Sequence, residues 1–591
     1  MIGVLIGAPH QSASLLDACQ LFPVSVTAGD LGAVYRDRGF GFRIRSGFVL
    51  TGSRRRVAAR ALTLLAAVPL LVVLAAGCGR GGSATPHTPV PVAAHPVDPA
   101  VVSIGTGMVR GVVSADYRLF AGLPYAAPPV GPLRWQPPRP AAPWPGVRDA
   151  SKTGPWCLQG NGGVADPGTS EDCLTLNVWT PPLNTTEKRP VMVWIHGGGF
   201  VNGSGDIYNA RWLATQGDIV VVTINYRLGA LGFLAHPALG EVGNYGLADQ
   251  QAALRWVRDN IASFGGDPTK VTIAGESAGG MSVCDHLVAP GSAGLFRAAI
   301  IQSGPCQAQV DVPTAQRVSQ DYAAAVGCAD PGAAGPCLRA LPAGKLAEPL
   351  WYARFGSDRL SGPVTGTRVL PVDPVAVTAT GGAAKVPVLI GTNADEFTMF
   401  VALQYLREGK EITAAEYPGV LADTFGAAIG PAVLAHYPPE RYGGSVSLAY
   451  AAAATDDIFS CLADRMTDGF SDGAPAVYAY EFDDRHAPAP EMYERVPFPI
   501  GASHSLEMRY LFDVGGAPPL DAEQRALSQQ MIAYWSHFVT TGAPKATGAP
   551  DWPKAGHDGP WLSLRTDGNR VTTSFEADHQ CPFWAAARAP R

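Results

Sequence analysis

The stretch Val271-Thr272-Ile273-Ala274-Gly275-Glu276-Ser277-Ala278-Gly279 decides the fold of this 591-residue chain. Its first four residues are mostly apolar and β-branched and predict a short buried strand, and the run from Gly280 to Leu287 can start a helix. Between them stands a Gly-x-Ser-x-Gly turn, whose glycines leave room for the neighbouring strand and helix. Such a corner exposes the Ser277 hydroxyl, and the helix N-terminus behind it favours developing negative charge. Although this pattern alone also occurs in glycine-rich loops, the preceding strand favours Ser277 as a nucleophile.

A second informative loop is His196-Gly197-Gly198-Gly199-Phe200, which follows a strand expected at Val191–Ile195. Attack of a serine on a carbonyl forms a tetrahedral oxyanion, which needs N–H donors already in place, and glycines let bare backbone approach the substrate. In an α/β-hydrolase, one donor belongs to the residue after the nucleophile, here Ala278, and the others to an earlier glycine-rich loop, here Gly198 and Gly199. A glycine triplet also suits a flexible turn, but two such loops in this order favour an oxyanion hole.

Several longer motifs point to one family. The segment Phe264–Gly279 resembles the serine signature of the type-B carboxylesterases, the cholinesterase-like family, and Glu171–Pro181 resembles its second signature. Further matching segments are Phe120–Ala126, Pro128–Gly131, Asn225–Arg227, Asn244–Gln250 and Gln580–Trp584. The resemblance covers residues 101–585 and implies ester hydrolysis by an α/β-hydrolase fold, a mostly parallel central sheet with helices on both faces. Strand–helix alternation between residues 190 and 304 supports this fold class directly.

The acid of the expected Ser–acid–His order has two candidates. A strand is expected at Val386–Gly391, and Asn393-Ala394-Asp395-Glu396 follows it. Asp395 and Glu396 therefore both stand just past a strand, where the acid belongs. The family resemblance implies that Glu396 is the acid and leaves Asp395 as the runner-up.

The base has to be chosen among the histidines that follow the acid. They are His436, His486, His504, His537, His557 and His579. A strand-like segment, Val477–Phe482, precedes the small-residue loop Gly501–Ser505, and the resemblance implies that His504 in this loop is the base. A lone histidine in a polar loop is more often a surface residue, so this assignment rests on the resemblance. His196 adjoins the glycine loop but precedes the serine, and we exclude it as the base.

Together these residues predict an acyl-enzyme mechanism. His504 takes the Ser277 proton, the serine attacks the ester carbonyl, and Glu396 orients the imidazole. Water activated by the same histidine then releases the acid. Glu276 either tunes the charge near His504 or serves as a hydrogen-bonded turn residue, and both interpretations stay open. Ser303, at the end of the next expected strand, is expected to join the residues that support the triad.

Charge and motif content limit the other function classes. The net charge is −6, and the first 77 residues hold eight Arg and three acidic residues, or +5, so the remainder carries −11. The sequence has no basic stripe, no zinc-knuckle spacing and no phosphate loop. We therefore exclude a nucleic-acid binder and expect neither a metal nor a cofactor.

The motifs run unbroken, which predicts one catalytic domain at 101–585. Helix-rich segments near 310–380 and 400–475 are interpreted as insertions that roof the active site.

A targeting segment is expected before this domain, as in a bacterial exported member of the family. Ser53–Arg56 and Arg60 form a positive region, and the uncharged run from Ala61 to Gly77 is too short for a confident membrane span, so residues 53–77 are interpreted as a signal peptide. The run Leu74–Cys78 resembles a bacterial lipoprotein cleavage box.

Cys78 is therefore expected to be lipidated and to provide the protein's only membrane contact, with an ordinary signal peptide as the alternative. Residues 1–52 are interpreted as an extension produced by a start site assigned too early. Residues 78–100, rich in Gly, Pro and Ala, are expected to be a disordered tether. These features predict a secreted protein or a cell-surface lipoprotein.

The cysteine content suits an oxidising compartment. Of ten cysteines, Cys19 and Cys78 lie outside the expected domain, which leaves eight. The resemblance implies the pairs Cys157–Cys173 and Cys461–Cys581, and Cys328 with Cys337 is expected to close a small loop. Cys284 and Cys306 remain, either as a fourth pair or as two buried free thiols.

The expected substrate is a neutral carboxylic ester. Cholinesterases carry an aromatic residue for the choline cation inside the first disulfide loop, but here Leu158–Asp172 contains no Trp, Tyr or Phe. Two alternatives remain: a hydrolase of amides, carbamates or lactones, and a catalytically silent adhesion protein of the same fold. Silent relatives have lost a triad member, whereas this chain retains Ser277, Glu396 and His504.

Overall fold

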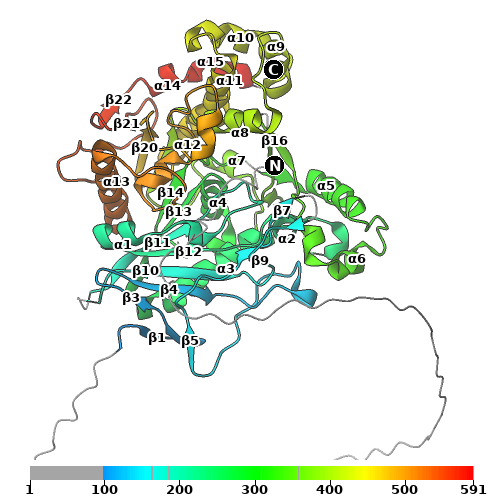
Figure 1. Ribbon diagram of the computed structural model, residues 1–591, viewed down its shortest axis with the longest axis vertical. Coiled ribbons are helices and arrows are strands. Elements are labelled where there is room, and N and C mark those ends of the chain that lie inside the picture. The colour runs from blue at the N-terminus through cyan, green and yellow to red at the C-terminus, as the bar shows by residue number, and fades with distance from the viewer. Residues whose placement is uncertain are drawn as a thin grey trace, which may run out of the picture. The chain divides into compact units, whose positions relative to one another are not determined.

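The structure, a computed structural model, describes residues 98–161, 164–183, 187–240, 243–307, 309–356 and 358–589. A central sheet of 11 strands organises this part of the chain (Figure 1). Its strand order is β22 (Arg570–Thr572), β21 (Trp561–Leu564), β20 (Val477–Phe482), β19 (Val388–Asn393), β14 (Ala298–Gln302), β13 (Gly266–Glu276), β11 (Arg189–Ile195), β12 (Val220–Ile224), β10 (Thr175–Thr180), β4 (Arg118–Pro124) and β3 (Val112–Val113). Neighbours from β21 to β12 are parallel, and the strands beyond them pair antiparallel. The expectations for residues 1–97, including Cys78, lie outside the described residues.

Both faces of the sheet are covered, which explains why its central strands are continuously apolar. On β11, Val191, Val193 and Ile195 enter one hydrophobic core, and Met192 and Trp194 enter the other. Helices α3 (Tyr245–Asn260), α4 (Ala278–Val288) and α12 (Cys461–Ser471) contribute to the first core, while α1 (Arg211–Gly217) and α13 (Ala522–Thr541) contribute to the second. This arrangement confirms the predicted α/β-hydrolase fold class.

The remaining helices lie mainly in the two segments expected as insertions. They are α2 (Gly229–Phe233), α5 (Val312–Ala325), α6 (Ala334–Ala340), α7 (Pro374–Thr378), α8 (Thr398–Glu408), α9 (Tyr417–Phe425), α10 (Gly430–His436), α11 (Val446–Thr455), α14 (Phe575–Asp578) and α15 (Cys581–Arg588). A π-helical turn, Asp456–Ser460, joins α11 to α12. The resulting helix Val446–Ser471 is long and apolar enough to cross a membrane, but 78% of its most apolar window is buried inside the protein, as in a core helix.

Small sheets complete the described fold. Strands β1 (Val101–Ile104), β2 (Gly107–Arg110) and β5 (Val147–Asp149) form one of them. The two-stranded pairs are β6 (Trp156–Cys157) with β9 (Thr169–Ser170), β7 (Gly160–Asn161) with β8 (Val164–Ala165), β15 (Val310–Asp311) with β18 (Val364–Thr365), and β16 (Ala353–Phe355) with β17 (Asp358–Leu360).

The parallel strands bring the predicted loops to one edge of the sheet, because the carboxyl ends of parallel strands lie together. The glycine loop follows β11, the serine corner follows β13, and the acid follows β19. Three strands have other bounds than the sequence predicted, and β11 is one of them, since it begins at Arg189 and not at Val191. β13 extends to Gly266 because its polar first half also runs extended, and β19 begins at Val388, after Pro387, whose ring nitrogen carries no hydrogen to donate.

Candidate active site

Ser277 occupies a strained corner between β13 and α4. Its backbone has φ 55° and ψ −125°, and such conformations cost a non-glycine residue about 1–3 kcal/mol, so they persist only where the surroundings enforce them. A Cβ at Gly275 would lie 2.9 Å from the Ile195 carbonyl oxygen, and one at Gly279 would lie 2.8 Å from the Ile195 carbonyl carbon. The Ser277 N–H donates to the Gln302 carbonyl at 2.9 Å. Both glycines are therefore required by close packing, and the serine is held at the tip of the turn.

The glycine loop lies directly against this corner. A Cβ at Gly197 would lie 3.1 Å from the Ser277 Cβ, and Gly198 and Gly199 have φ values of 102° and 62°. In the described chain, no backbone hydrogen bond uses the N–H groups of Gly198, Gly199 or Ala278. Because Ala278 begins α4, its N–H also lies at the positive end of a helix. These three N–H groups have no backbone partner among the described residues, and the loop that carries two of them contacts the Ser277 Cβ through Gly197.

Glu396 and His504 form a buried pair. Glu396 Oε2 lies 2.6 Å from His504 Nδ1, and both side chains are fully or almost fully buried. The other carboxylate oxygen, Oε1, accepts hydrogen bonds from the Thr392 hydroxyl at 2.9 Å and the Asn393 N–H at 2.8 Å. With Nδ1 bound to a fixed carboxylate, the imidazole orientation is set and Nε2 faces the other way.

Glu276 lies on that other side of the imidazole. Its Oε1 is 3.2 Å from His504 Nε2 and also accepts a hydrogen bond from the Ser505 hydroxyl. Burial by itself would lower the pKa of His504, but the charges of Glu276 and Glu396 outweigh it and raise the pKa to about 9. Of the two interpretations left open for Glu276, the structure supports direct influence on the histidine, with a hydrogen bond besides.

A third carboxylate, Glu507, was missed by the sequence analysis. It is fully buried on the 3₁₀ turn Leu506–Tyr510 and accepts a hydrogen bond from Asn393 Nδ2 at 2.7 Å. Burial, followed by the charges of Glu276 and Glu396, raises the pKa of Glu507 to about 8. Its position three residues after His504 was the one available signal.

Ser303 follows β14 with φ 49°, and its N–H donates to the Gly391 carbonyl at 2.9 Å. Its hydroxyl is buried and has no hydrogen-bond partner among the described residues. The structure thus places Ser303 next to the strand that leads to Glu396 but shows no hydrogen bond from its hydroxyl to Glu276.

The runner-up acid, Asp395, and the excluded histidine, His196, have other partners. Asp395 Oδ1 lies 2.8 Å from Arg485 Nη1, and its Oδ2 accepts the Ala502 N–H at 2.9 Å, so this carboxylate is bound away from His504. His196 is buried, with Nδ1 2.8 Å from the Gly197 carbonyl, and burial lowers its pKa to about 4. Neither geometry suits the role of triad acid or base.

An apolar wall flanks the imidazole. The rings of Phe400 and Phe459 each lie 5.2 Å from the His504 ring, and Phe355 packs edge-on against both phenylalanines. Leu360 approaches the glycine loop, since a Cβ at Gly199 would lie 3.6 Å from Leu360 Cδ1. The surroundings of His504 and of the glycine loop are therefore aromatic and aliphatic on this side.

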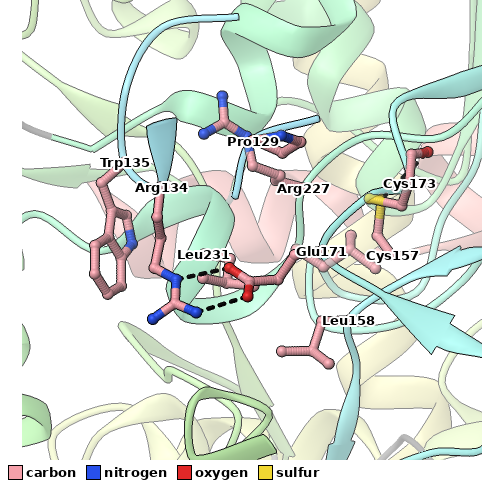
Figure 2. Close-up of a pocket in the computed structure, with 10 residues that line it drawn as sticks. Pro129, Arg134, Trp135, Cys157, Leu158, Glu171, Cys173, Arg227 and Leu231 are labelled. Carbon is pink, nitrogen blue, oxygen red and sulfur yellow. Dashed lines mark hydrogen bonds and ion pairs between the residues drawn. A yellow bond between two sulfur atoms is a disulfide. The ribbon is translucent and has the colours of Figure 1, made fainter. Parts of the chain in front are cut away.

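A pocket beside the first disulfide is not a ligand site (Figure 2). Arg134 donates from Nε and Nη2 to the two carboxylate oxygens of Glu171 at 2.7 and 2.6 Å, next to Trp135 and the Cys157–Cys173 bridge. The space between these groups has no room for a water molecule. We interpret this buried ion pair as a structural link.

The described chain contains the expected disulfides and one more. The bridges are Cys157–Cys173, Cys328–Cys337, Cys461–Cys581 and Cys284–Cys306. The fourth settles the alternative between a pair and two free thiols. Within the same residues, no group of three or more His, Cys, Asp or Glu side chains is placed to hold a metal ion.

Comparison with known proteins agrees with this geometry. The model of the carboxylesterase family matches residues 98–584. Pyrethroid hydrolase Ces2e of Rattus norvegicus is 35% identical over 497 residues, which cover 78% of this chain and 85% of the relative. Acylcarnitine hydrolase of Mus musculus is 36% identical over 492 residues (78% and 86%), and fumonisin B1 esterase of Sphingopyxis macrogoltabida is 36% identical over 516 residues (82% and 89%). The chain therefore belongs to the carboxylesterase family and is a carboxylic ester hydrolase.

Proposed function

We propose that Ser277, His504 and Glu396 perform this hydrolysis through an acyl-enzyme intermediate. His504 Nε2 removes the proton of the Ser277 hydroxyl, and the serine oxygen attacks the ester carbonyl. The N–H groups of Gly198, Gly199 and Ala278 hold the resulting oxyanion. The imidazolium then gives its proton to the departing alcohol, while Glu396 keeps the ring oriented and stabilises its charge. In the second half, the histidine activates water, which releases the carboxylic acid.

One observation carries this proposal. Within the part of the chain that the structure describes, Glu396 is the only carboxylate bound to His504 Nδ1, and its Oε2 lies 2.6 Å from that nitrogen. The strained serine corner and the glycine loop lie against each other, as acyl transfer needs.

Ser277→Ala tests the nucleophile. We expect hydrolysis of p-nitrophenyl butyrate to fall by about a millionfold, the cost of removing the nucleophile of such a triad, with an unchanged thermal midpoint. A fluorophosphonate probe should label Ser277 in the wild type, as located by peptide mass spectrometry. A tenth of the activity remaining in the alanine variant would show that another residue is the nucleophile.

For the substrate, we propose neutral esters with short to medium acyl chains. Support comes from the first disulfide loop, which lacks an aromatic residue, and from the phenylalanine wall beside His504. An exposed cation–π contact contributes about 0.5–1 kcal/mol and a desolvated one about 2 or more, so its loss removes roughly two- to thirtyfold of selectivity for a charged alcohol.

The comparison to make is kcat/KM for butyrylcholine against an uncharged butyrate ester of similar size. An acylcarnitine belongs in the panel because one relative hydrolyses such esters. Matched amide, carbamate and lactone substrates address the alternative bond types. A clear preference for butyrylcholine would contradict the neutral-ester proposal.

We also propose export of a bacterial protein with a lipid on Cys78. The support is the arginine cluster at 54–56, the run Leu74–Cys78 and the four disulfides, which are typical of proteins outside the reducing cytosol. Mass spectrometry of the mature N-terminus should find diacylglycerol on Cys78. An unmodified N-terminus beyond residue 78 would indicate plain secretion instead.

A further inference from the structure

The Cys284–Cys306 disulfide joins the helix of the serine corner to the loop behind it. Cys284 lies in α4, two turns after Ser277, and Cys306 lies in the loop that follows β14, here named the back loop (residues 303–307). Both cysteines are almost completely buried, and their Cα atoms are 5.3 Å apart. The bond therefore connects two segments that pack around the nucleophile.

The back loop touches the peptide that carries Ser277. A Cβ at Gly304 would collide with the Ser277 carbonyl oxygen and would lie 2.8 Å from the Met281 nitrogen. Just before the back loop, the Gln302 carbonyl accepts the Ser277 N–H at 2.9 Å. The polypeptide around Ser303 thus contacts both the N–H and the C=O side of the nucleophile, and any shift of the back loop reaches the serine directly.

Three residues in this contact adopt left-handed backbone conformations without being glycine. Their φ values are 55° for Ser277, 49° for Ser303 and 49° for Cys306. Such conformations persist only when the surrounding structure enforces them. A covalent link from Cys306 to α4 is a direct way to enforce the conformation of the back loop, and through it that of the serine.

A second link follows immediately along the helix. Gln309 Nε2 donates to Asp285 Oδ1 at 3.0 Å, so consecutive residues of α4 hold the polypeptide that leaves the back loop. On another side of α4, His286 Nε2 lies 2.9 Å from Gln250 Oε1, and Gln250 Nε2 donates to the Ser282 hydroxyl at 3.1 Å. The helix is thus anchored to α3, and the disulfide anchors the back loop to the helix.

We propose that Cys284 and Cys306 are positioning residues for acyl transfer: their disulfide holds the back loop against the Ser277 peptide and so keeps the serine hydroxyl in line with His504. This inference rests on the proposed role of Ser277. It assigns the disulfide an effect on the rate of the acylation step, beyond the stability that any cross-link contributes by restricting the unfolded chain.

The test compares two paired variants. Cys284→Ala/Cys306→Ala removes the bond in question, and Cys328→Ala/Cys337→Ala, which opens the loop between α5 and α6, is the matched control. For each variant we would measure the thermal midpoint, kcat and KM, and the single-turnover rate of p-nitrophenol release. A misplacement of about 1 Å can cost about a hundredfold, so we expect acylation in the first variant to fall at least tenfold with KM within about threefold.

The control should lower the thermal midpoint while acylation stays within about twofold of wild type, because no described hydrogen bond or disulfide joins Cys328 or Cys337 to Ser277, Glu396 or His504. Acylation within twofold of wild type in the folded Cys284→Ala/Cys306→Ala variant would overturn the proposal. An equal loss in both variants would do the same, because it would show a general effect of cross-link removal.

If the double variant does not fold, the wild-type protein gives the answer. Folded enzyme is treated with tris(2-carboxyethyl)phosphine, free thiols are trapped with N-ethylmaleimide, and peptide mass spectrometry reports which bridge has opened. Loss of acylation should follow opening of Cys284–Cys306 and not of Cys328–Cys337. Full acylation with Cys284 and Cys306 alkylated would refute the proposal.

Fluorophosphonate labelling separates the proposed role of Ser277 from the proposed role of the disulfide. Failure to label Ser277 in the wild type contradicts the nucleophile and leaves the role of the disulfide unaffected.

Discussion

Two buried histidines in this protein each lie between two carboxylates, and they differ in how the second ring nitrogen is held. His504 Nδ1 is 2.6 Å from a Glu396 oxygen, whereas its Nε2 is 3.2 Å from Glu276 Oε1. The same Glu276 oxygen also accepts a hydrogen bond from the Ser505 hydroxyl. The Nε2 side of the ring is therefore loosely held, and it is the side that a general base uses.

His579 is held tightly on both sides. Its Nδ1 lies 2.6 Å from Asp456 and its Nε2 lies 2.7 Å from Glu481. The Tyr437 hydroxyl donates to the other oxygen of Asp456 at 2.7 Å and accepts the Trp584 indole N–H at 2.7 Å. Burial opposes the charged imidazole, but Asp456 and Glu481 outweigh it and raise the pKa of His579 well above its usual value.

The comparison agrees with His504 as the proposed base, because its Nε2 lies 3.2 Å from a carboxylate oxygen, whereas Nε2 of His579 lies 2.7 Å from one. The same short segment serves both sites: the π-helical turn Asp456–Ser460 carries Asp456, which binds His579, and Phe459, whose ring packs 5.2 Å from His504. His579 therefore fixes the C-terminal tail to the turn that backs the proposed base, and we expect its role to be structural.

The largest expected contrast comes from replacing each histidine by alanine. His504→Ala should reduce kcat by about a millionfold with a folded protein, because no base remains. His579→Ala should leave kcat within about tenfold but destabilise the fold by about 3–5 kcal/mol, the usual result of leaving buried charges without their partner. Ester turnover and urea unfolding of both variants give the measurement. A folded His579→Ala enzyme with a thousandfold lower kcat would place His579 in the reaction.

Glu396→Gln should cost up to about 10⁴-fold in kcat, because the amide cannot stabilise the imidazolium that forms during attack. The matched control is Asp395→Asn, one residue earlier, whose carboxylate pairs with the half-exposed Arg485. We expect the control to retain activity within about fivefold, since exposed ion pairs contribute little. Steady-state kinetics with one neutral ester decides the case, and a greater loss in Asp395→Asn would reverse the assignment of the acid.

Local sequence patterns predicted the parts of this site that depend on local chain geometry. The serine corner follows from glycine spacing between an apolar strand and a helix, and β20 spans Val477–Phe482 as expected from its apolar run. The choice of Glu396 and His504 as acid and base came from the family resemblance, and the structure joins the two side chains by a hydrogen bond that spans 108 residues. Nothing in the local pattern around either residue shows that contact.

Other features depend on packing between distant segments, and local sequence patterns do not distinguish them. Glu507 is one acid among fifty acidic residues, and only burial beside Asn393 distinguishes it. Cys284 and Cys306 could be paired only once the back loop was seen against α4. His579 looked like any histidine near the C-terminus, because its partners Asp456 and Glu481 lie about a hundred residues earlier.

The smallest expected effect is a shift of the pH profile in Glu276→Gln. The base must be neutral, so activity is lost as pH falls through the pKa of His504, which the flanking carboxylates raise above the ordinary value near 6.5. Removing the Glu276 charge lowers that pKa, and the acid limb of kcat/KM should move to lower pH by about 1 unit, the usual effect of one adjacent charge.

The free energy of unfolding depends on pH in the opposite direction to the activity. The raised pKa of His504 stabilises the fold below pH 6.5, and this contribution disappears as pH rises through the folded-state pKa. The matched control is Glu481→Gln beside His579, which should leave the acid limb in place while weakening the fold. Profiles of kcat/KM between pH 5 and 10 make the comparison, and an unmoved limb in Glu276→Gln would show that Glu276 does not set the charge of the base.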